Sequence, residues 1–143
     1  MSREILFRGK RIDNGEWIEG FYFEANEKHM ILNFTVQKNE LYHNMYEIEP
    51  NTVCQYTGLT DKNGNRIWEN DFLTCRKYIG GNFVDEHIEC GFIEMKHGAF
   101  GIHRKNPNAY YRPFKDWLED YEYEVIGNVF DNPELLEKRN EES

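Results

Sequence analysis

The histidines and cysteines in the second half of the chain are the residues with the clearest potential for chemistry. His87, Cys90, His97 and His103 are all side chains that zinc accepts, but no close pair among them has a familiar zinc spacing. His87 and Cys90 are three positions apart in an expected strand, so their side chains should point to opposite faces. We therefore expect no metal site and no cofactor.

The sequence also offers few residues that could act as catalytic nucleophiles. Serine occurs only at positions 2 and 143, where no rigid scaffold is expected to hold a nucleophile. Cys54, Cys75 and Cys90 lie in or beside expected strands, where a cysteine usually acts as a small buried hydrophobic residue. We therefore expect a protein that is not an enzyme. An enzyme would need a concave site built from residues that are unrelated in sequence.

Segment 54–73, which reads CQYTGLTDKNGNRIWENDFL, contains the most distinctive polar loop. Asn63-Gly64 at the tip of this loop tolerates positive φ, and the apolar runs on either side are typical of strands. The segment therefore predicts a hairpin. Glu69-Asn70-Asp71 then predicts a tight turn into a further strand that starts at Phe72.

If the protein has a ligand surface, we expect it around this loop. The candidates are two flanking aromatic residues and three polar residues expected to be exposed at the tip, namely Tyr56, Trp68, Asp61, Lys62 and Asn63. The alternative for the two aromatic residues is a place in the core. The alternative for Asp61 and Asp71 is a turn in which the carboxylate accepts hydrogen bonds from nearby backbone.

Basic residues interleaved with aromatic ones form a second candidate surface, for nucleic acid. They are Arg8, Lys10 and Arg11, next to Phe7, and Arg112, which follows a pair of tyrosines. Affinity for phosphates needs a basic footprint, whereas the chain has a net charge of −9. Nucleic-acid binding is therefore the second hypothesis, behind protein–protein association.

The charge is unevenly distributed along the chain. Residues 1–12 contain four basic residues and one acidic residue, whereas residues 115–143 contain three basic and ten acidic residues. This asymmetry could direct the N-terminal face of one subunit onto the C-terminal face of another, or onto an acidic partner. A solvated surface is the simpler explanation.

The composition fits one domain, or two small domains packed closely together. Phe, Tyr and Trp make up 15% of the chain, so a core is feasible although only 39% of the residues are hydrophobic. Three cysteines leave at least one unpaired within the chain, and no segment resembles a signal peptide or a membrane span. We expect a soluble, reduced protein in the cytoplasm.

Turn and alternation patterns predict a mainly β chain. Asn14-Gly15 predicts a two-residue turn between strands over residues 6–12 and 17–23, with Gly9 opposite Gly20. Paired glycines indicate a sharp bend or the close approach of another backbone. Aromatic residues on both faces of this hairpin indicate a second layer or a second subunit. Further strands are expected over residues 30–36, 42–48, 72–79, 99–103 and 121–129, and residues 83–95 are expected to form one strand or a bent pair of strands.

Two short helices are expected near the C-terminus. Apolar residues at helical spacing predict the first over residues 113–120. Asn132-Pro133-Glu134 predicts the start of the second, which should run to about Arg139. Pro50 breaks the preceding strand, so a soft boundary is expected between an N-terminal part, residues 1–50, and a C-terminal part, residues 51–143.

Three blocks in order along the chain resemble one known family. QYTGLTDKNGNRIWENDF, at residues 55–72, is similar to the signature QYTGLxDKNGxxIYEGDxV of the YopX family of phage and prophage proteins. FRGKRIDNGEWIEGFYF and EVIGNVFDNPELL, at residues 7–23 and 124–136, fit as well. Trp68 stands where the family usually has Tyr, and Asn70 stands where it usually has Gly. Because Asn also adopts left-handed φ, we expect the turn to survive.

The resemblance implies a β-rich protein in a bacterial host cell, with a C-terminal part similar to an SH3-like barrel. It implies no established activity. We expect a hairpin-rich N-terminal part packed on this barrel, with one or two short helices near the C-terminus. The expected function is that of a non-enzymatic phage accessory protein, a binding module that self-associates and has a host or phage protein as a further possible partner.

Overall fold

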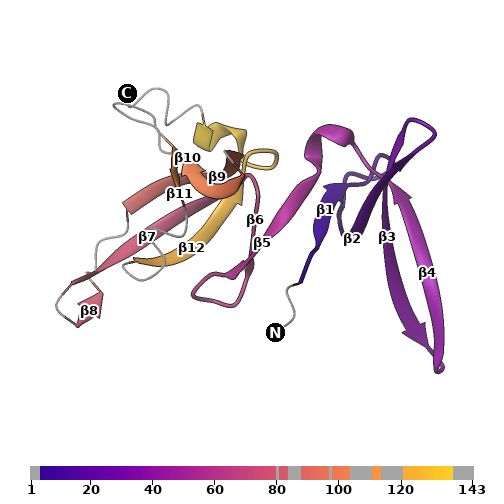
Figure 1. Ribbon diagram of the computed structural model, residues 1–143, viewed down its shortest axis with the longest axis horizontal. Helices are drawn as coiled ribbons and strands as arrows, with labels where there is room; N and C mark the ends of the chain where they lie inside the picture. Colours follow the sequence, from indigo (N-terminus) through magenta and orange to yellow (C-terminus); the bar gives the residue numbers. More distant parts are fainter. Residues whose placement is uncertain are drawn as a thin grey trace. The chain divides into compact units, whose positions relative to one another are not determined.

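The computed structural model describes residues 4–79, 81–83, 88–96, 98–103, 111–113 and 121–136. At positions 77–79, 83, 88–90, 111–113 and 121 it describes the backbone alone. The chain divides into two compact units, residues 1–56 and residues 57–143, and both are built from antiparallel strands (Figure 1). The expectation of a mainly β fold is therefore confirmed. In the part of the chain described, no helix is long and apolar enough to cross a membrane.

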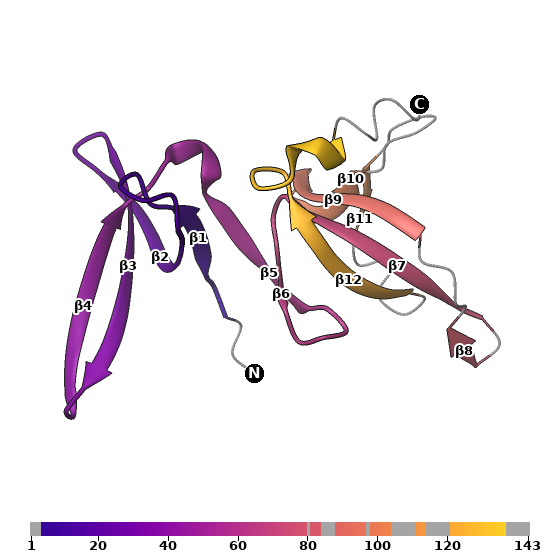
Figure 2. The same ribbon diagram turned by 180° about the vertical axis from the view of Figure 1, so that it is seen from behind.

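The N-terminal unit is a sheet with the strand order β4-β3-β2-β1-β5. Its strands are β1 (Phe7–Lys10), β2 (Trp17–Ala25), β3 (Lys28–Gln37), β4 (Glu40–Glu47) and the first residues of β5 (Cys54–Thr60). The 3₁₀ helix η1 (Pro50–Thr52) connects β4 to β5, as expected from a proline that ends a strand. Strands β3 and β4 form a long hairpin with β4 at the outer margin of the unit (Figures 1 and 2).

Two-residue turns set the register of the two outer hairpins. Asn26 and Glu27 have φ values of 51° and 64°, and Lys38 and Asn39 have the same two values. Positive φ at both central residues is the signature of the type I′ turn, whose twist matches that of the flanking strands. Gln37 therefore pairs with Glu40, and the pairing continues to Met30 and Glu47.

The first hairpin is paired differently from the prediction. The turn at Asn14-Gly15 is part of a four-residue loop, because the Arg11 N–H donates to the Glu16 carbonyl at 2.9 Å and the Gly15 N–H donates to the Arg11 carbonyl at 2.9 Å. Gly15 has a φ of 73° and closes this loop. Consequently Gly9 pairs with Ile18, not with Gly20. The shift is two residues, so each side chain stays on its expected face.

The close approach of another backbone is confirmed at Gly20, whereas at Gly9 the close neighbour is a side chain. A Cβ atom on Gly20 would lie 2.3 Å from the Leu32 carbonyl oxygen, and one on Gly9 would lie 2.2 Å from Ile48 Cγ2. These contacts bring the chain tightly against the most buried residues of the unit, Ile31, Ile48 and Cys54, which are at most 1% exposed. Glycine is therefore required at these positions by packing, since any side chain would overlap its neighbours.

The C-terminal unit contains a five-stranded sheet in the order β11-β10-β9-β7-β12. Its strands are β7 (Asp71–Ile79), β9 (Ile88–Lys96), β10 (Ala99–His103), β11 (Tyr111–Pro113) and β12 (Tyr121–Asn128), and the short β8 (Asn82–Phe83) pairs with β7. The remaining residues of β5 pair with β6 (Arg66–Trp68). The predicted strands over residues 72–79, 99–103 and 121–129 thus appear within one residue of their expected bounds.

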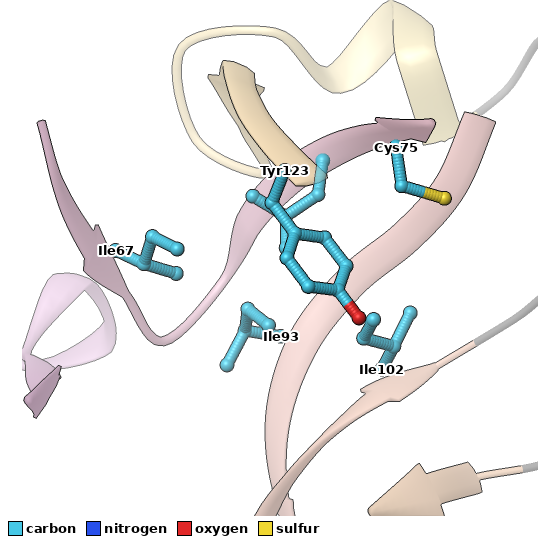
Figure 3. Packing of buried hydrophobic residues seen from close by; sticks show 6 residues of the cluster. Ile67, Cys75, Ile93, Ile102 and Tyr123 are labelled. Carbon is cyan, nitrogen blue, oxygen red and sulfur yellow. The ribbon is translucent and has the colours of Figure 1, made fainter. Parts of the chain in front are cut away.

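The core of this unit is contributed by several strands. It consists of Ile67, Leu73, Cys75, Ile93, Ile102 and Tyr123, all of them at most 6% exposed. Figure 3 shows the ring of Tyr123 beside Ile93, with its hydroxyl oxygen directed toward Ile102. Burying aromatic and branched residues from neighbouring strands together is what an antiparallel sheet with one covered face requires.

The cysteines differ in state. Cys54 is a buried thiol outside any disulfide and its Sγ donates to the Thr52 carbonyl at 3.2 Å, whereas Cys75 is bound in a disulfide. The third cysteine of the chain, Cys90, has no described side chain. The expectation of one unpaired cysteine is therefore confirmed, and the expectation of a fully reduced chain is wrong for Cys75.

One short helix occurs near the C-terminus, at residues 133–136, and it begins at the expected Pro133. Residues 137–143, where this helix was expected to end, lie outside the part of the chain described. The predicted helix over 113–120 is not supported at its first residue, because Pro113 belongs to β11, and its other residues also lie outside the described part.

The Gly20 contact predicts the effect of a single methyl group. We expect Gly20→Ala to lower the free energy of unfolding by about 1–3 kcal/mol, because the added Cβ meets a backbone carbonyl that cannot rotate away. Glu24→Ala, on an exposed residue of the same strand, should change it by less than about 0.5 kcal/mol. Urea unfolding followed by circular dichroism measures both. Equal effects of the two substitutions would contradict the close packing at Gly20.

Candidate functional site

The N-terminal sheet exposes one face that is unusually apolar. Five large residues of strands β2, β3 and β4 point to this face and are between 48% and 69% exposed, and we call them the open face: Phe21, Phe34, Val36, Leu41 and Met45. Soluble proteins rarely expose a contiguous group of such residues unless it binds something. The open face is therefore the strongest candidate for an interaction surface.

Strand register explains why these residues gather. Phe21 is opposite Leu32, which is opposite Met45, and Val36 is opposite Leu41. Residues directly opposite each other in an antiparallel pair lie on the same face. The rings of Phe21 and Phe34 also contact each other edge to face, with centroids 6.4 Å apart. One apolar row thus crosses three strands, a second joins Val36 to Leu41, and Phe34, opposite His43, lies between the two rows.

The opposite face of the same strands is covered near β2, and we call this part the covered face. Ile31 is fully buried there, because its side chain points to the side away from Phe34 and Val36. Tyr22 lies on this face and pairs with His29, through a 2.5 Å hydrogen bond between its hydroxyl and His29 Nδ1 and through ring stacking at 5.9 Å. This face is therefore covered near β2 but exposed towards the β3–β4 turn, where Thr35 is exposed and Tyr42 is 45% exposed.

The open face was only partly predictable from the sequence. Alternation of apolar residues over 30–36 predicted a strand correctly, and its larger apolar side carries Phe34 and Val36. The usual interpretation would bury that side. In the structure the buried residue is Ile31, on the more polar side, and only the paired register of β4 identifies Leu41 and Met45 as members of the same patch.

A basic and aromatic cluster lies on the same face of the sheet. Arg8 is opposite Glu19 and Lys10 is opposite Trp17, so all four side chains share the face that carries Phe21 further along β2. The Arg8 guanidinium lies 4.3 Å from the centroid of the Trp17 ring, and Lys10 Nζ lies 5.4 Å from it. Two of the residues proposed for nucleic-acid binding are thus brought together, already in contact with a ring of the same unit.

Arg11 is directed elsewhere. Its guanidinium lies 4.6 Å from the Tyr46 ring and donates two hydrogen bonds to the Asp13 carboxylate, at 2.9 and 2.5 Å. The hydrogen bond from Arg11 lowers the pKa of Asp13 below its usual value. Arg112, the fourth residue of the proposed nucleic-acid surface, lies in β11 of the other unit, where its side chain is not described.

A depression of about 380 Å³ lies beside Arg11. It is lined by Arg11, Ile12, Asp13, Met45, Tyr46 and Glu47. Its one basic side chain is accompanied by two carboxylates, so the depression has no surplus of positive charge with which to hold a phosphate group. Met45 belongs both to this depression and to the open face.

The residues proposed around the central loop are mostly structural in their placement. Tyr56 and Trp68 are only 8% and 3% exposed, and they belong to the N-terminal and C-terminal units respectively. Lys62 and Asn63 are exposed, as expected for the loop tip. Asp61 was also expected to be exposed but is 7% exposed, so this prediction is wrong.

Asp61 is buried because its carboxylate organises the loop. Oδ1 accepts the backbone N–H groups of Asn63 and Asn65, both at 2.9 Å, and Oδ2 accepts the Val125 N–H of β12 at 3.1 Å and the Asn65 side-chain amide at 3.3 Å. Burial raises the pKa of Asp61, but the hydrogen bonds lower it by more, so its net pKa is below the usual value. The turn role considered for Asp61 is therefore the one observed.

The turn between β6 and β7 is structural too. Asn70 has a φ of 73°, so the expected left-handed conformation is confirmed. Its N–H donates to the Ile93 carbonyl at 2.7 Å, and its carbonyl accepts the Val129 N–H at 3.0 Å. Asp71, 2% exposed, accepts the Trp68 N–H at 2.8 Å. This turn thus joins β9 to the end of β12.

The histidines and cysteines considered for metal binding are only partly described. His103 Nδ1 lies 3.2 Å from Glu94 Oε1, and its ring stacks on Phe92 with centroids 4.9 Å apart. His87 and His97, and the side chain of Cys90, lie outside the described part. Among the residues that are described, no three His, Cys, Asp or Glu side chains gather as metal ligands would.

Asp61 predicts a specific loss of stability. In Asp61→Asn an amide NH₂ replaces a carboxylate oxygen that accepts backbone N–H groups, so two hydrogen-bond donors face each other. We therefore expect the free energy of unfolding at pH 7 to fall by about 2–3 kcal/mol. Asp13→Asn makes the same chemical change at a fully exposed position, where solvent screens the ion pair with Arg11, so it should destabilise the fold far less. Denaturant unfolding of the three proteins makes the comparison.

The lowered pKa adds a pH dependence with a fixed sign. The ionised Asp61 stabilises the folded chain at neutral pH, and this contribution is lost as the pH falls from about 4, the usual carboxyl pKa, through the lower folded-state pKa. The difference in unfolding free energy between the wild-type chain and Asp61→Asn should therefore narrow below about pH 4. A constant difference across this range would contradict the assignment.

Comparisons with known proteins agree with the motif analysis. No curated protein and no solved structure matches this chain. A family model, described as YopX protein, matches residues 6–137 and so covers nearly all of both units. The three blocks that resemble the family signature all lie within this match. The chain therefore belongs to the YopX family.

Proposed function

We propose that this protein is a non-enzymatic binding module that self-associates, and that it acts as an accessory protein of a phage or prophage in the cytoplasm of the host bacterium. The observation that carries the proposal is the open face. The phage association is supported by the resemblance of the central block, residues 55–72, to the signature of phage and prophage proteins.

Energetics favour a partner for the open face. Fully burying a Val, Leu, Met or Phe side chain is worth about 1.5–3 kcal/mol, and each of the five residues still has roughly half or more of its surface in water. A second copy of the chain offers an identical apolar surface, which an interface with two-fold symmetry can match to itself. A host or phage protein with a complementary apolar surface is the other class of partner.

We also propose that the C-terminal unit is an SH3-like barrel. Strands β7, β9, β10 and β11 follow one another as an antiparallel meander, and β12 returns to pair with β7. This order, in which a fifth strand returns to the first, is that of SH3-like barrels. The register shifts by one residue between Val125 and Gly127 in β12, and such bulges bend strands toward closure.

Nucleic-acid binding is the second candidate function. It is favoured by the cluster of Arg8, Lys10 and Trp17, since an aromatic ring beside basic groups is typical of surfaces that bind single strands. It is opposed by the net charge of −9 and by the pairing of Arg11 with Asp13. Binding of this kind predicts an affinity for a labelled oligonucleotide that falls steeply as salt increases, with a smaller slope in Lys10→Ala.

Self-association predicts the mass of the chain in solution. At tens of micromolar, light scattering after size exclusion should give at least twice the mass of 17.2 kDa. Leu41→Lys places a charge in the open face, so this substitution should shift the mass toward that of a monomer. Thr35→Lys, on the other face of the neighbouring strand β3 and also exposed, is the control and should leave the mass unchanged.

Two results would count against the proposal. A monodisperse monomer at this concentration would contradict self-association. Equal effects of Leu41→Lys and Thr35→Lys would show that association occurs elsewhere than through the open face. Thermal unfolding of both variants checks that neither substitution acts by unfolding the sheet.

A further inference from the structure

We infer that a second copy of this chain pairs with strand β4 edge to edge, antiparallel, with the two-fold axis at His43. This inference rests on the proposed self-association and adds the strand, the register and the residue at the axis. It makes the open face of each copy continuous with that of the other.

Strand β4 is the edge of its sheet. It pairs with β3 on one side and is the first strand in the order β4-β3-β2-β1-β5, and both ribbon views place it at the outer margin of the unit (Figures 1 and 2). An edge strand presents a row of N–H and C=O groups that can pair with another strand. β-strand addition at such an edge is a recurrent mode of protein recognition.

The hydrogen bonds between β3 and β4 show which residues of β4 direct their backbone groups away from β3. The two-residue turn makes Gln37 and Glu40 a hydrogen-bonded pair, and the Ile48 N–H donates to the His29 carbonyl at 2.9 Å, so the even-numbered residues of β4 bond to β3. The odd-numbered residues Leu41, His43 and Met45 therefore direct their N–H and C=O groups outward. Beyond them the Glu47 carbonyl accepts the Ile12 N–H at 3.0 Å, which ends the open stretch.

This pattern selects one register. In an antiparallel pair the outward residues of one copy must face outward residues of the other. An axis at His43 places His43 opposite His43 of the partner subunit and Leu41 opposite Met45 of the partner subunit. Every outward donor and acceptor from Leu41 to Met45 then has a partner. An axis at Tyr42 would place Met45 opposite the β3–β4 turn of the partner subunit. An axis at Asn44 would place Leu41 opposite Glu47 of the partner subunit, whose carbonyl already accepts the Ile12 N–H.

The side chains in this register are compatible. Leu41 and Met45, which are 69% and 55% exposed in one copy, would pack against each other across the axis on the open face. On the other face Tyr42 would lie opposite Asn44 of the partner subunit, and Glu40 opposite Tyr46 of the partner subunit. The acids of β4 are at its two ends, Glu40 and Glu47, so no acid faces an acid.

Strand β4 also lacks the devices that protect edges. Lysine, proline and β-bulges commonly prevent edge strands from pairing. Between Glu40 and Glu47 there is no lysine and no proline, and the pairing with β3 continues without a register shift. The stretch from Leu41 to Tyr46 carries no acidic or basic charge when His43 is neutral.

A disulfide tests the axis directly. In His43→Cys the two introduced thiols would belong to a directly opposed pair with Cα atoms about 5.5 Å apart, within the range for a disulfide. In Tyr42→Cys they would be two residues out of register and about 8 Å apart, which is too far. Under mild oxidation of the full-length chain, we expect a covalent dimer for His43→Cys and none for Tyr42→Cys or for the wild-type chain.

Proline tests the backbone bonds. His43→Pro deletes an outward N–H in each copy without touching the bonds to β3, so the dissociation constant of the dimer should rise at least about tenfold. His43→Val keeps this N–H and should keep the dimer. Circular dichroism and the unfolding midpoint of both variants verify the fold of each.

The outcomes separate this inference from the proposed function. A covalent dimer that forms in His43→Cys alone, together with loss of association in His43→Pro alone, supports the β4 pairing. If the chain self-associates but His43→Cys does not cross-link, or cross-links no better than Tyr42→Cys, the pairing is wrong while the self-association stands. If the wild-type chain is a monomer, or if it binds only a different protein through the open face, both the pairing and the self-association are wrong.

Discussion

Two type I′ turns determine which side chains of the N-terminal sheet lie on each of its two faces. Asn26-Glu27 and Lys38-Asn39 each join neighbouring strands through two residues with positive φ. Such turns leave no freedom in register, because a slip of one residue would turn every side chain to the other face. In β3 the resulting register places Ile31 on the covered face and Phe34 and Val36 on the open face. A turn with one residue more or one residue fewer would exchange the two faces, so Ile31 would become exposed and the residues of the open face would point to the covered side.

The strands of this chain could be predicted well because turn chemistry is local. Asn-Gly pairs, the Glu69-Asn70-Asp71 turn and the proline at position 50 act through the φ preferences of one or two residues. The register of the first hairpin was harder, because the same Asn14-Gly15 pair closes either a two-residue or a four-residue loop. The difference lies in hydrogen bonds to Arg11, one of them from the Gly15 N–H. Nothing in the local sequence distinguishes the two.

The candidate sites were less predictable because exposure is a tertiary property. Asp61 is an acidic residue in a loop, which is typical of an exposed residue. Its carboxylate nevertheless accepts the Val125 N–H, 64 positions away in sequence, and is buried. The open face was missed for the converse reason. Alternation identifies two sides of a strand but does not say which one faces the core, and in β3 the fully buried residue is on the less apolar side.

The recognisable signature of the family and the proposed interaction surface involve different residues. The signature block contains three residues that form hydrogen bonds with backbone groups of the C-terminal unit, namely Asp61, Asn70 and Asp71. They make this stretch distinctive because few residues can replace a buried acceptor or a left-handed turn. The open face instead needs only large apolar side chains at alternate positions, so many sequences can satisfy it.

Charge limits where two copies of this chain can meet. Each copy carries −9, so two copies repel each other over most approaches. Screening weakens this repulsion beyond about 8 Å at physiological ionic strength, and the remaining cost depends on which charges come into contact. Strand β4 presents six residues without acidic or basic charge between its terminal acids. The repulsion is therefore reduced along the same edge that has open backbone groups and an apolar face, and this combination favours a second copy as its partner.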